Sequence, residues 1–326
     1  PYKPGGDVNG NAEAVTPEIP GYMVVEAPAD DAEALAGCLN GKQGPIALKF
    51  VTGNTYKADM ITVPADITDL LLIGKEGQAK VTMKGLSVPE RTLNKLTFQD
   101  LEIEGTDANT AICAAELKED AELTVKGCYI HGVKAVYGRG KDLAQKHSTD
   151  FSRLSSFTID DSRIYNVECV FDYGVVLAVT LNNSTLYNLS QIAFFSSKSN
   201  DTNDIKQCEP IKVTNCTLVD LKKNLVQTAG GYGYLTNYEN NISILAGDAH
   251  IAYGVKGANN SAYTFVIQNN IAATGSGIKI ADFTNNGAID NTKSRAEIFP
   301  NEDAGDSGKN FTPADGITIG DPRWKK

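Results

Sequence analysis

Hydrophobic and polar positions alternate along the middle of the chain in short segments that repeat. Residues 157–167 read FTIDDSRIYNV and residues 179–189 read VTLNNSTLYNL, with apolar side chains in step and a polar pair at the same place. Similar copies begin at Leu96, Leu123 and Ile211. Apolar alternation at a period of two, in segments rich in Thr and Val, predicts β-strands and does not fit a helix. The repeat therefore predicts a stack of similar turns.

Each copy contains two strands joined by a bend. The bend falls on Asp100, Gly127, Asp161, Asn183 and Asn215, all residue types that tolerate a left-handed backbone. A third short strand is available in each turn, and insertions of variable length follow it. Three short strands per turn with variable loops predict a parallel β-helix of about nine or ten turns, in which each turn buries its inward residues against its neighbours.

Two segments are candidates for covering the open ends of this stack. Residues 31–42, DDAEALAGCLNG, place Ala and Leu on one helical face, with acidic residues at the start and Gly41 at the end. This pattern predicts an N-terminal cap helix. The tail that contains Trp324 is the candidate for the other end. We expect an N-terminal extension or linker over residues 1–24 and one β-helix domain over residues 25–326.

Composition narrows the choice of partners. The formal net charge of -10 argues against nucleic acid, which needs a surplus of Lys and Arg. No apolar run approaches the roughly 20 residues that cross a bilayer, so no transmembrane segment is expected. We also expect a monomer. The six cysteines form no CxxC pair, so we expect free thiols. Cys128 and Cys216 should point inward, separated by the turns that carry Ser162 and Ser184.

The predicted cap helix, the segment PIALKFVTGNTYKADMITVPADITDLLLIGKEG and the Asn-containing bends resemble the pectate-lyase-like right-handed parallel β-helix superfamily. The resemblance covers nearly the whole chain from about residue 25. The closing FTPADGITIGDPRW resembles the tail of uncharacterised β-helix proteins that Bacteroidetes export. The resemblance implies an all-β, single-stranded right-handed parallel β-helix located outside the cytoplasm, at the cell surface, in the periplasm or secreted. Members of the superfamily are mostly polysaccharide lyases or glycoside hydrolases, several of them calcium-dependent, and a minority bind carbohydrate without catalysis.

The NTD, DD, GHG and RIK motifs of the polygalacturonase branch are not assembled in this sequence. A DD pair does occur at Asp160 and Asp161, but it falls at a bend. A uronate lyase instead needs a base, usually Lys or Arg, and a cation that neutralises the substrate carboxylate. The insertion over residues 134–153 is locally basic in an acidic protein, and a second insertion over residues 197–210 carries carboxylates suited to calcium. The catalytic candidates are Arg139, Lys141, Lys146 and His147, the substrate-binding candidates are Lys134, Tyr137, Arg153, Tyr173 and Tyr253, and the calcium candidates are Asp201, Asp204 and Glu209.

Two classes of function stay open. The chain is expected to be an extracytoplasmic polysaccharide lyase that acts by β-elimination on an acidic glycan, or a non-catalytic glycan-binding or structural surface protein. The charges of both insertions are also consistent with ordinary solvated loops. Sugar binding uses aromatic faces, and Tyr165 and Tyr187 are expected to share one outward column and to stack along the surface.

Overall fold

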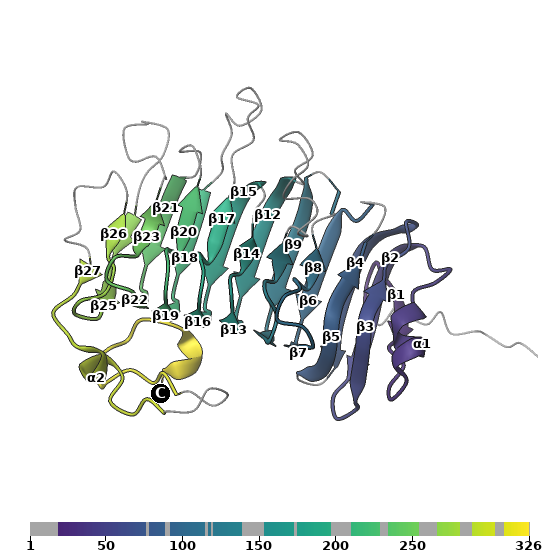
Figure 1. Cartoon of the computed structure of the whole chain (residues 1–326), viewed down its shortest axis with the longest axis horizontal. Coiled ribbons are helices and arrows are strands. Elements are labelled where there is room, and N and C mark those ends of the chain that lie inside the picture. The colour runs from purple at the N-terminus through teal and green to yellow at the C-terminus, as the bar shows by residue number, and fades with distance from the viewer. Residues whose placement is uncertain are drawn as a thin grey trace, which may run out of the picture.

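The chain forms a parallel β-solenoid with little helix (Figure 1). This computed structural model describes residues 19–75, 78–88, 92–114, 117–118, 120–138, 153–172, 175–196, 210–228, 234–253, 266–280, 289–303 and 310–325. Within these residues, about seven successive turns carry three strands each, and the turns before them carry two. The expectation of nine or ten turns is therefore too high for complete three-stranded turns.

Three parallel ladders run along the solenoid, each formed by the equivalent strand of successive turns. The first ladder contains β1 (Met23–Glu26), β2 (Gly44–Val51), β4 (Ile67–Lys75), β6 (Lys95–Gln99), β9 (Ala121–Lys126), β12 (Arg153–Asp160), β15 (Val175–Asn182), β18 (Pro210–Thr214), β21 (Tyr234–Glu239) and β24 (Val266–Gln268). The second contains β3 (Tyr56–Thr62), β5 (Ala79–Ser87), β7 (Leu101–Gly105), β10 (Tyr129–His131), β13 (Arg163–Val167), β16 (Thr185–Leu189), β19 (Thr217–Leu221), β22 (Ile242–Leu245), β25 (Asn270–Ala272) and β27 (Ile289–Asp290). The third contains β8 (Cys113–Ala114), β11 (Tyr137–Gly138), β14 (Phe171–Asp172), β17 (Phe194–Ser196), β20 (Val226–Thr228), β23 (His250–Tyr253) and β26 (Lys279–Ile280).

The predicted register of the repeat is confirmed. Thr158 pairs with Thr180 between β12 and β15, and Ile164 pairs with Leu186 between β13 and β16, so the two similar segments are neighbouring turns. The bend between the first and second strands is left-handed at every predicted position, with φ of 52° at Asp100, 62° at Gly127, 45° at Asp161, 48° at Asn183 and 54° at Asn215. Asn and Asp recur there because they adopt positive φ at lower cost than other side chains do.

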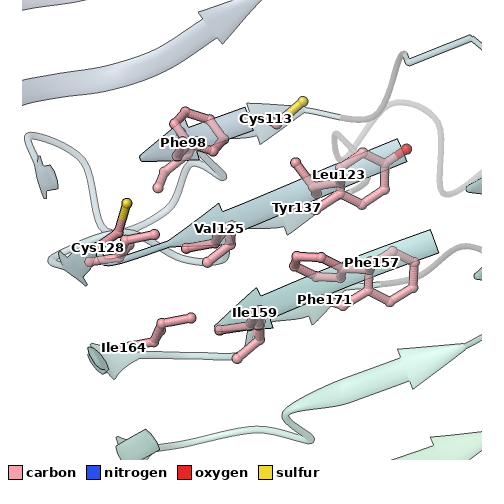
Figure 2. Close-up of a cluster of buried hydrophobic side chains, with 14 of the residues drawn as sticks. Phe98, Cys113, Leu123, Val125, Cys128, Tyr137, Phe157, Ile159, Ile164 and Phe171 are labelled. Carbon is pink, nitrogen blue, oxygen red and sulfur yellow. The ribbon is translucent and has the colours of Figure 1, made fainter. Parts of the chain in front are cut away.

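The inside of the solenoid is a continuous apolar core with one polar column beside the bend. Figure 2 shows part of the core, where Phe98, Val125 and Ile159 of successive turns point to the same interior. In the polar column, the backbone N–H of Cys128 donates to Ser162 Oγ at 3.1 Å, and the N–H of Ser162 donates to Ser184 Oγ at 3.1 Å. Each buried hydroxyl therefore has a partner, as a buried polar group requires.

The cysteine prediction is confirmed for the five cysteines that the structure describes. Cys128 and Cys216 are both buried and unpaired, and the turns of Ser162 and Ser184 lie between them. Two intervening turns place them about 14 Å apart at ~4.8 Å per turn, beyond the reach of a disulfide. Cys208 lies outside the described residues.

The predicted N-terminal helix is present but shorter than expected. Helix α1 spans Ala32–Gly37, and the Asp31 side chain caps it by accepting the N–H of Ala34 at 2.9 Å. The helix lies at the N-terminal end of the solenoid in Figure 1, and Leu35 and Leu39 are fully buried in the main core.

The C-terminal segment, defined here as residues 291–303 and 310–325, differs from the prediction that it closes the far end. It carries α2 (Arg295–Ile298) and the 3₁₀ helix η3 (Pro322–Trp324), and it lies along the outside of the second ladder, beside β16, β19 and β22 (Figure 1). Tyr165 and Tyr187 stack as predicted, with ring centroids 4.7 Å apart, but they are buried by this segment. The expectation that they lie on an open surface is wrong, because the outward tyrosine column is a docking face.

Candidate functional site

Most of the residues predicted to carry chemistry lie outside the described residues. This group contains Arg139, Lys141, Lys146, His147, Tyr173, Asp201, Asp204 and Glu209. Arg153 begins strand β12, and its side chain is likewise outside the description. The lyase chemistry and the calcium site thus remain predictions. Among the described residues, no group of three or more His, Cys, Asp or Glu side chains is placed to hold a metal ion.

Tyr137 does not fit the substrate-binding role expected for it. Its side chain is 1% exposed, and its ring stacks on Phe171 with centroids 5.3 Å apart (Figure 2). Because Tyr137 is the inward residue of β11, the ring belongs to the core and cannot contact a ligand at the surface. Around this two-residue strand, the alternation of apolar and polar residues in the sequence is too short to predict whether the Tyr137 side chain points inward or outward.

Lys134 and Tyr253 are at the surface but are not brought together. Lys134 donates to Asp172 Oδ2 at 2.6 Å, and this hydrogen bond raises the pKa of the lysine. Tyr253 is 49% exposed at the end of β23, with the His250 ring 5.2 Å away. Between the strand that follows Lys134 and the strand of Tyr253, the third ladder contains β14, β17 and β20. At ~4.8 Å per strand, the two residues are about 19 Å apart.

The C-terminal segment encloses a cleft that the sequence did not indicate. The cleft has a volume of about 360 Å³, within the range of small-molecule sites. Its lining combines an aromatic ring and hydrocarbon groups with polar side chains, from Pro300, Asn301, Thr312, Pro313, Ala314, Asp315, Gly316, Ile317, Thr318, Trp324 and Lys325.

No helix in the described part of the chain is both long and apolar enough to cross a membrane.

Four polar side chains of the cleft have no partner among the described residues: Asn301, Asp315, Thr318 and Lys325. All four are exposed, so their donors and acceptors are open to a ligand. The remaining polar groups of the lining are already used. Thr312 Oγ1 donates to Asn310 Oδ1 at 2.6 Å, and Trp324 Nε1 donates to Thr185 Oγ1 at 2.7 Å. The Trp324 ring is thus fixed in place while the four open groups are free to bind.

Comparison of the chain with protein-family models, with curated proteins and with solved structures finds no match.

Apolar packing holds the cleft-bearing segment on the solenoid wall. Phe311 is fully buried, with its ring centroid 5.3 Å from Tyr187, 5.5 Å from Phe299 and 5.8 Å from Trp324. Val219 and Ile242 of the second ladder belong to the same buried cluster. This cluster is distinct from the main core, so the segment has a small hydrophobic core of its own against the wall.

Two polar anchors fix the ends of the same segment. Arg295 of α2 donates to both carboxylate oxygens of Asp220, at 2.6 and 2.9 Å, and also pairs with Glu302. Near the other end, Asp321 Oδ2 accepts from Thr185 Oγ1 at 2.6 Å, and the Asp321 N–H donates to Thr217 Oγ1 at 3.0 Å. Burial raises the pKa of the Asp321 carboxyl above its ordinary value. The cleft-bearing segment is therefore held by charge pairs at one end and by hydrogen bonds of Asp321 to the solenoid wall at the other.

Beside Trp324, the Arg163 guanidinium lies among four aromatic rings. Its Cζ is 5.0 Å from the centroid of Tyr129, 5.1 Å from Trp324, 5.7 Å from Tyr165 and 5.9 Å from Tyr187. Its Nε and Nη2 atoms are buried and have no hydrogen-bond partner. No pattern in the sequence predicts this cluster, because Arg163 is one polar residue in an ordinary repeat and Trp324 is 161 positions away.

Proposed function

We propose that the protein binds a glycan in the cleft of its C-terminal segment. The observation that carries the proposal is that one cleft joins a fixed tryptophan ring to four uncommitted polar side chains. The C–H face of a sugar packs against an aromatic ring, while the hydroxyls at its edge need donors and acceptors placed around it. A partner of purely apolar or purely ionic character would leave half of this lining unmatched.

The roles of the open groups follow from their chemistry. Asn301 and Thr318 can each donate and accept, Asp315 accepts, and Lys325 donates. Sugar hydroxyls act as both donors and acceptors, so such a mixed set suits them better than a set of one sign. The volume of about 360 Å³ suits one or two sugar units at the end or side of a longer chain.

This proposal takes the non-catalytic of the two functions left open by the sequence. Lyase activity on an acidic glycan stays a prediction, since the residues assigned to its base chemistry and to calcium lie outside the described residues. On the resemblance, we also propose that the solenoid is right-handed, that α1 caps its N-terminal end, and that the protein works outside the cytoplasm.

The test is a glycan-array and calorimetric comparison of Asn301→Ala and Thr318→Ala with the wild type. Loss of a net hydrogen bond of about 1 kcal/mol should weaken binding by roughly fivefold for each variant. Asn40→Ala and Thr62→Ala are matched controls, because both residues are exposed. Asn40 follows α1 and Thr62 ends β3, and these two elements lie at the opposite end of the solenoid (Figure 1). A glycan that binds the wild type and both cleft variants equally would show that the cleft is not its site.

A further inference from the structure

We infer that Arg163, with Arg323, forms an anion site for a carboxylate or sulfate group at the seam between the solenoid wall and η3. The seam is defined by Tyr129 and Arg163 of the second ladder and by Arg323 and Trp324 of η3. This site is separate from the hydrogen-bonding groups of the cleft, and the inference does not depend on the proposed glycan binding.

The state of Arg163 differs from that of the other arginines on this side of the molecule. Arg295 is paired with two carboxylates, Asp220 and Glu302. Arg323 pairs through Nε with Asp321 and through Nη2 with Asp161. The Arg163 side chain forms no hydrogen bond and no ion pair with any described residue. An arginine held in place without a counter-charge is the expected resting state of a site whose anion comes from outside the chain.

Unmet donors gather at the seam. Arg163 Nε and Nη2 and Arg323 Nη1 are buried without a hydrogen-bond partner. Both guanidinium groups face the Tyr129 ring, with Cζ to centroid distances of 5.0 Å for Arg163 and 5.8 Å for Arg323. Leaving a buried donor unpaired is costly, so the fold would gain from a ligand that pairs these groups.

The surrounding aromatic rings hold Arg163 in position when no anion is bound. Cation–π attraction from several rings stabilises a guanidinium and aligns its plane, but it supplies no hydrogen-bond acceptor. A planar guanidinium presents two parallel N–H groups, which match the two oxygens of a carboxylate or of a sulfate. Arg163 is partly exposed as a residue, whereas its Nε and Nη2 atoms are buried, so an anion that pairs with them must displace part of their cover at the seam.

The nearby acidic residues are already engaged elsewhere. Asp161 and Asp321 pair with Arg323, and Glu102 is shared between Lys80 at 3.4 Å and His131 at 3.3 Å. No carboxylate of the described residues lies within ion-pair distance of the Arg163 guanidinium. The chemistry selects an external anion with at least two oxygens, as found on uronic acids and on sulfated sugars.

Intrinsic fluorescence gives a direct readout, since Trp324 is the single tryptophan of the chain and its ring contacts Arg163. We expect inorganic sulfate and digalacturonate to change this fluorescence saturably, at ionic strength held constant with chloride. Neutral galactobiose should give no change that depends on Arg163. In Arg163→Met the affinity for sulfate and digalacturonate should fall at least tenfold, because the charge and the paired donors are both lost.

Lys57→Met is the matched control, as it removes one positive charge at an exposed position on β3. Circular dichroism should show that both variants keep the solenoid. If Arg163→Met does not fold, Arg163→Lys preserves the charge among the rings but loses the planar fork, and we expect weaker binding with the melting temperature retained. Equal sulfate and digalacturonate affinity in wild type, Arg163→Met and Arg163→Lys would overturn the inference and assign Arg163 to holding η3 alone.

Failure of this site and failure of the cleft are distinguishable. Loss of sulfate binding with Arg163→Met, together with unchanged binding in Asn301→Ala, supports the anion site whether or not any glycan occupies the cleft. A fluorescence response to chloride as large as that to sulfate would count against a specific site. Binding of digalacturonate without binding of sulfate would support the site and assign it to carboxylates.

Discussion

Replacing Phe311 by Ala should detach the C-terminal segment while the solenoid stays folded. Phe311 is fully buried and contacts three other aromatic rings, and its cluster is separate from the main core. A buried Phe→Ala change costs about 3–5 kcal/mol, and the lost aromatic pairs are included in that figure. The whole loss falls on the docking of the segment, because the main core is not touched.

The experiment follows two signals during urea unfolding. Fluorescence of Trp324 reports docking of the segment, and far-ultraviolet circular dichroism reports the strands. At a slope of about 1–3 kcal/mol per molar urea, the loss lowers the midpoint of the fluorescence transition by about 1 M or more. The midpoint of the circular dichroism transition should stay close to that of the wild type.

The matched control is Phe98→Ala, a change of the same size inside the main core. Here both signals should move together, since the segment cannot stay docked on an unfolded wall. A joint shift of both signals in Phe311→Ala would refute the reasoning, because it would show that the segment and the solenoid unfold as one cooperative unit.

Three further changes test the register, the docking and the thiols. Leu181→Asp should unfold the protein in circular dichroism, since Leu181 is fully buried and an unpaired charge there costs several kcal/mol, whereas Thr180→Asp on the outward face should be tolerated. Burial raises the pKa of Asp321 above its ordinary 3.8, so the ionised carboxylate opposes docking of the C-terminal segment. The urea midpoint of the Trp324 fluorescence transition should therefore rise as pH falls from the raised pKa towards 3.8. The Asp321→Asn variant should lack this rise. Cys128 and Cys216 should resist alkylation until the chain is denatured, and then label as two free thiols in mass spectrometry; burial raises the pKa of Cys128 to about 12.

The sequence predicted the repeating part of the molecule well because the repeat is local. Thr158 and Thr180, or Ile164 and Leu186, are brought into register by a periodicity that can be read within about 30 residues. The bend residue is equally local, since positive φ depends on the side chain at that one position. The same apolar pattern and bend residue recur in each turn, so one wrongly placed strand would have put the neighbouring turns out of register.

The rest of the fold depends on contacts without a period. The sequence places Tyr165 and Tyr187 correctly in an outward column but contains no sign of what covers them. Their cover is the segment around Phe311, more than 100 residues further along the chain. Outward aromatic residues are equally compatible with an open sugar-binding face and with a docking face. Only the tertiary structure distinguishes the two, and here it shows a docking face.

The difference between repeating and non-repeating structure explains where the candidate sites lie. A regular solenoid wall presents similar side chains turn after turn, and its polar groups pair with one another, as Asn182 does with Asp160 at 3.0 Å and with Thr214 at 2.8 Å. Open donors and acceptors therefore collect where the repeat is interrupted. The described interruption is the C-terminal segment, which brings Trp324 beside Arg163 and leaves Asn301 and Thr318 uncommitted. The non-repeating segment supplies the open groups of the cleft, and the solenoid supplies Arg163, so the binding chemistry of this molecule is expected where the two meet.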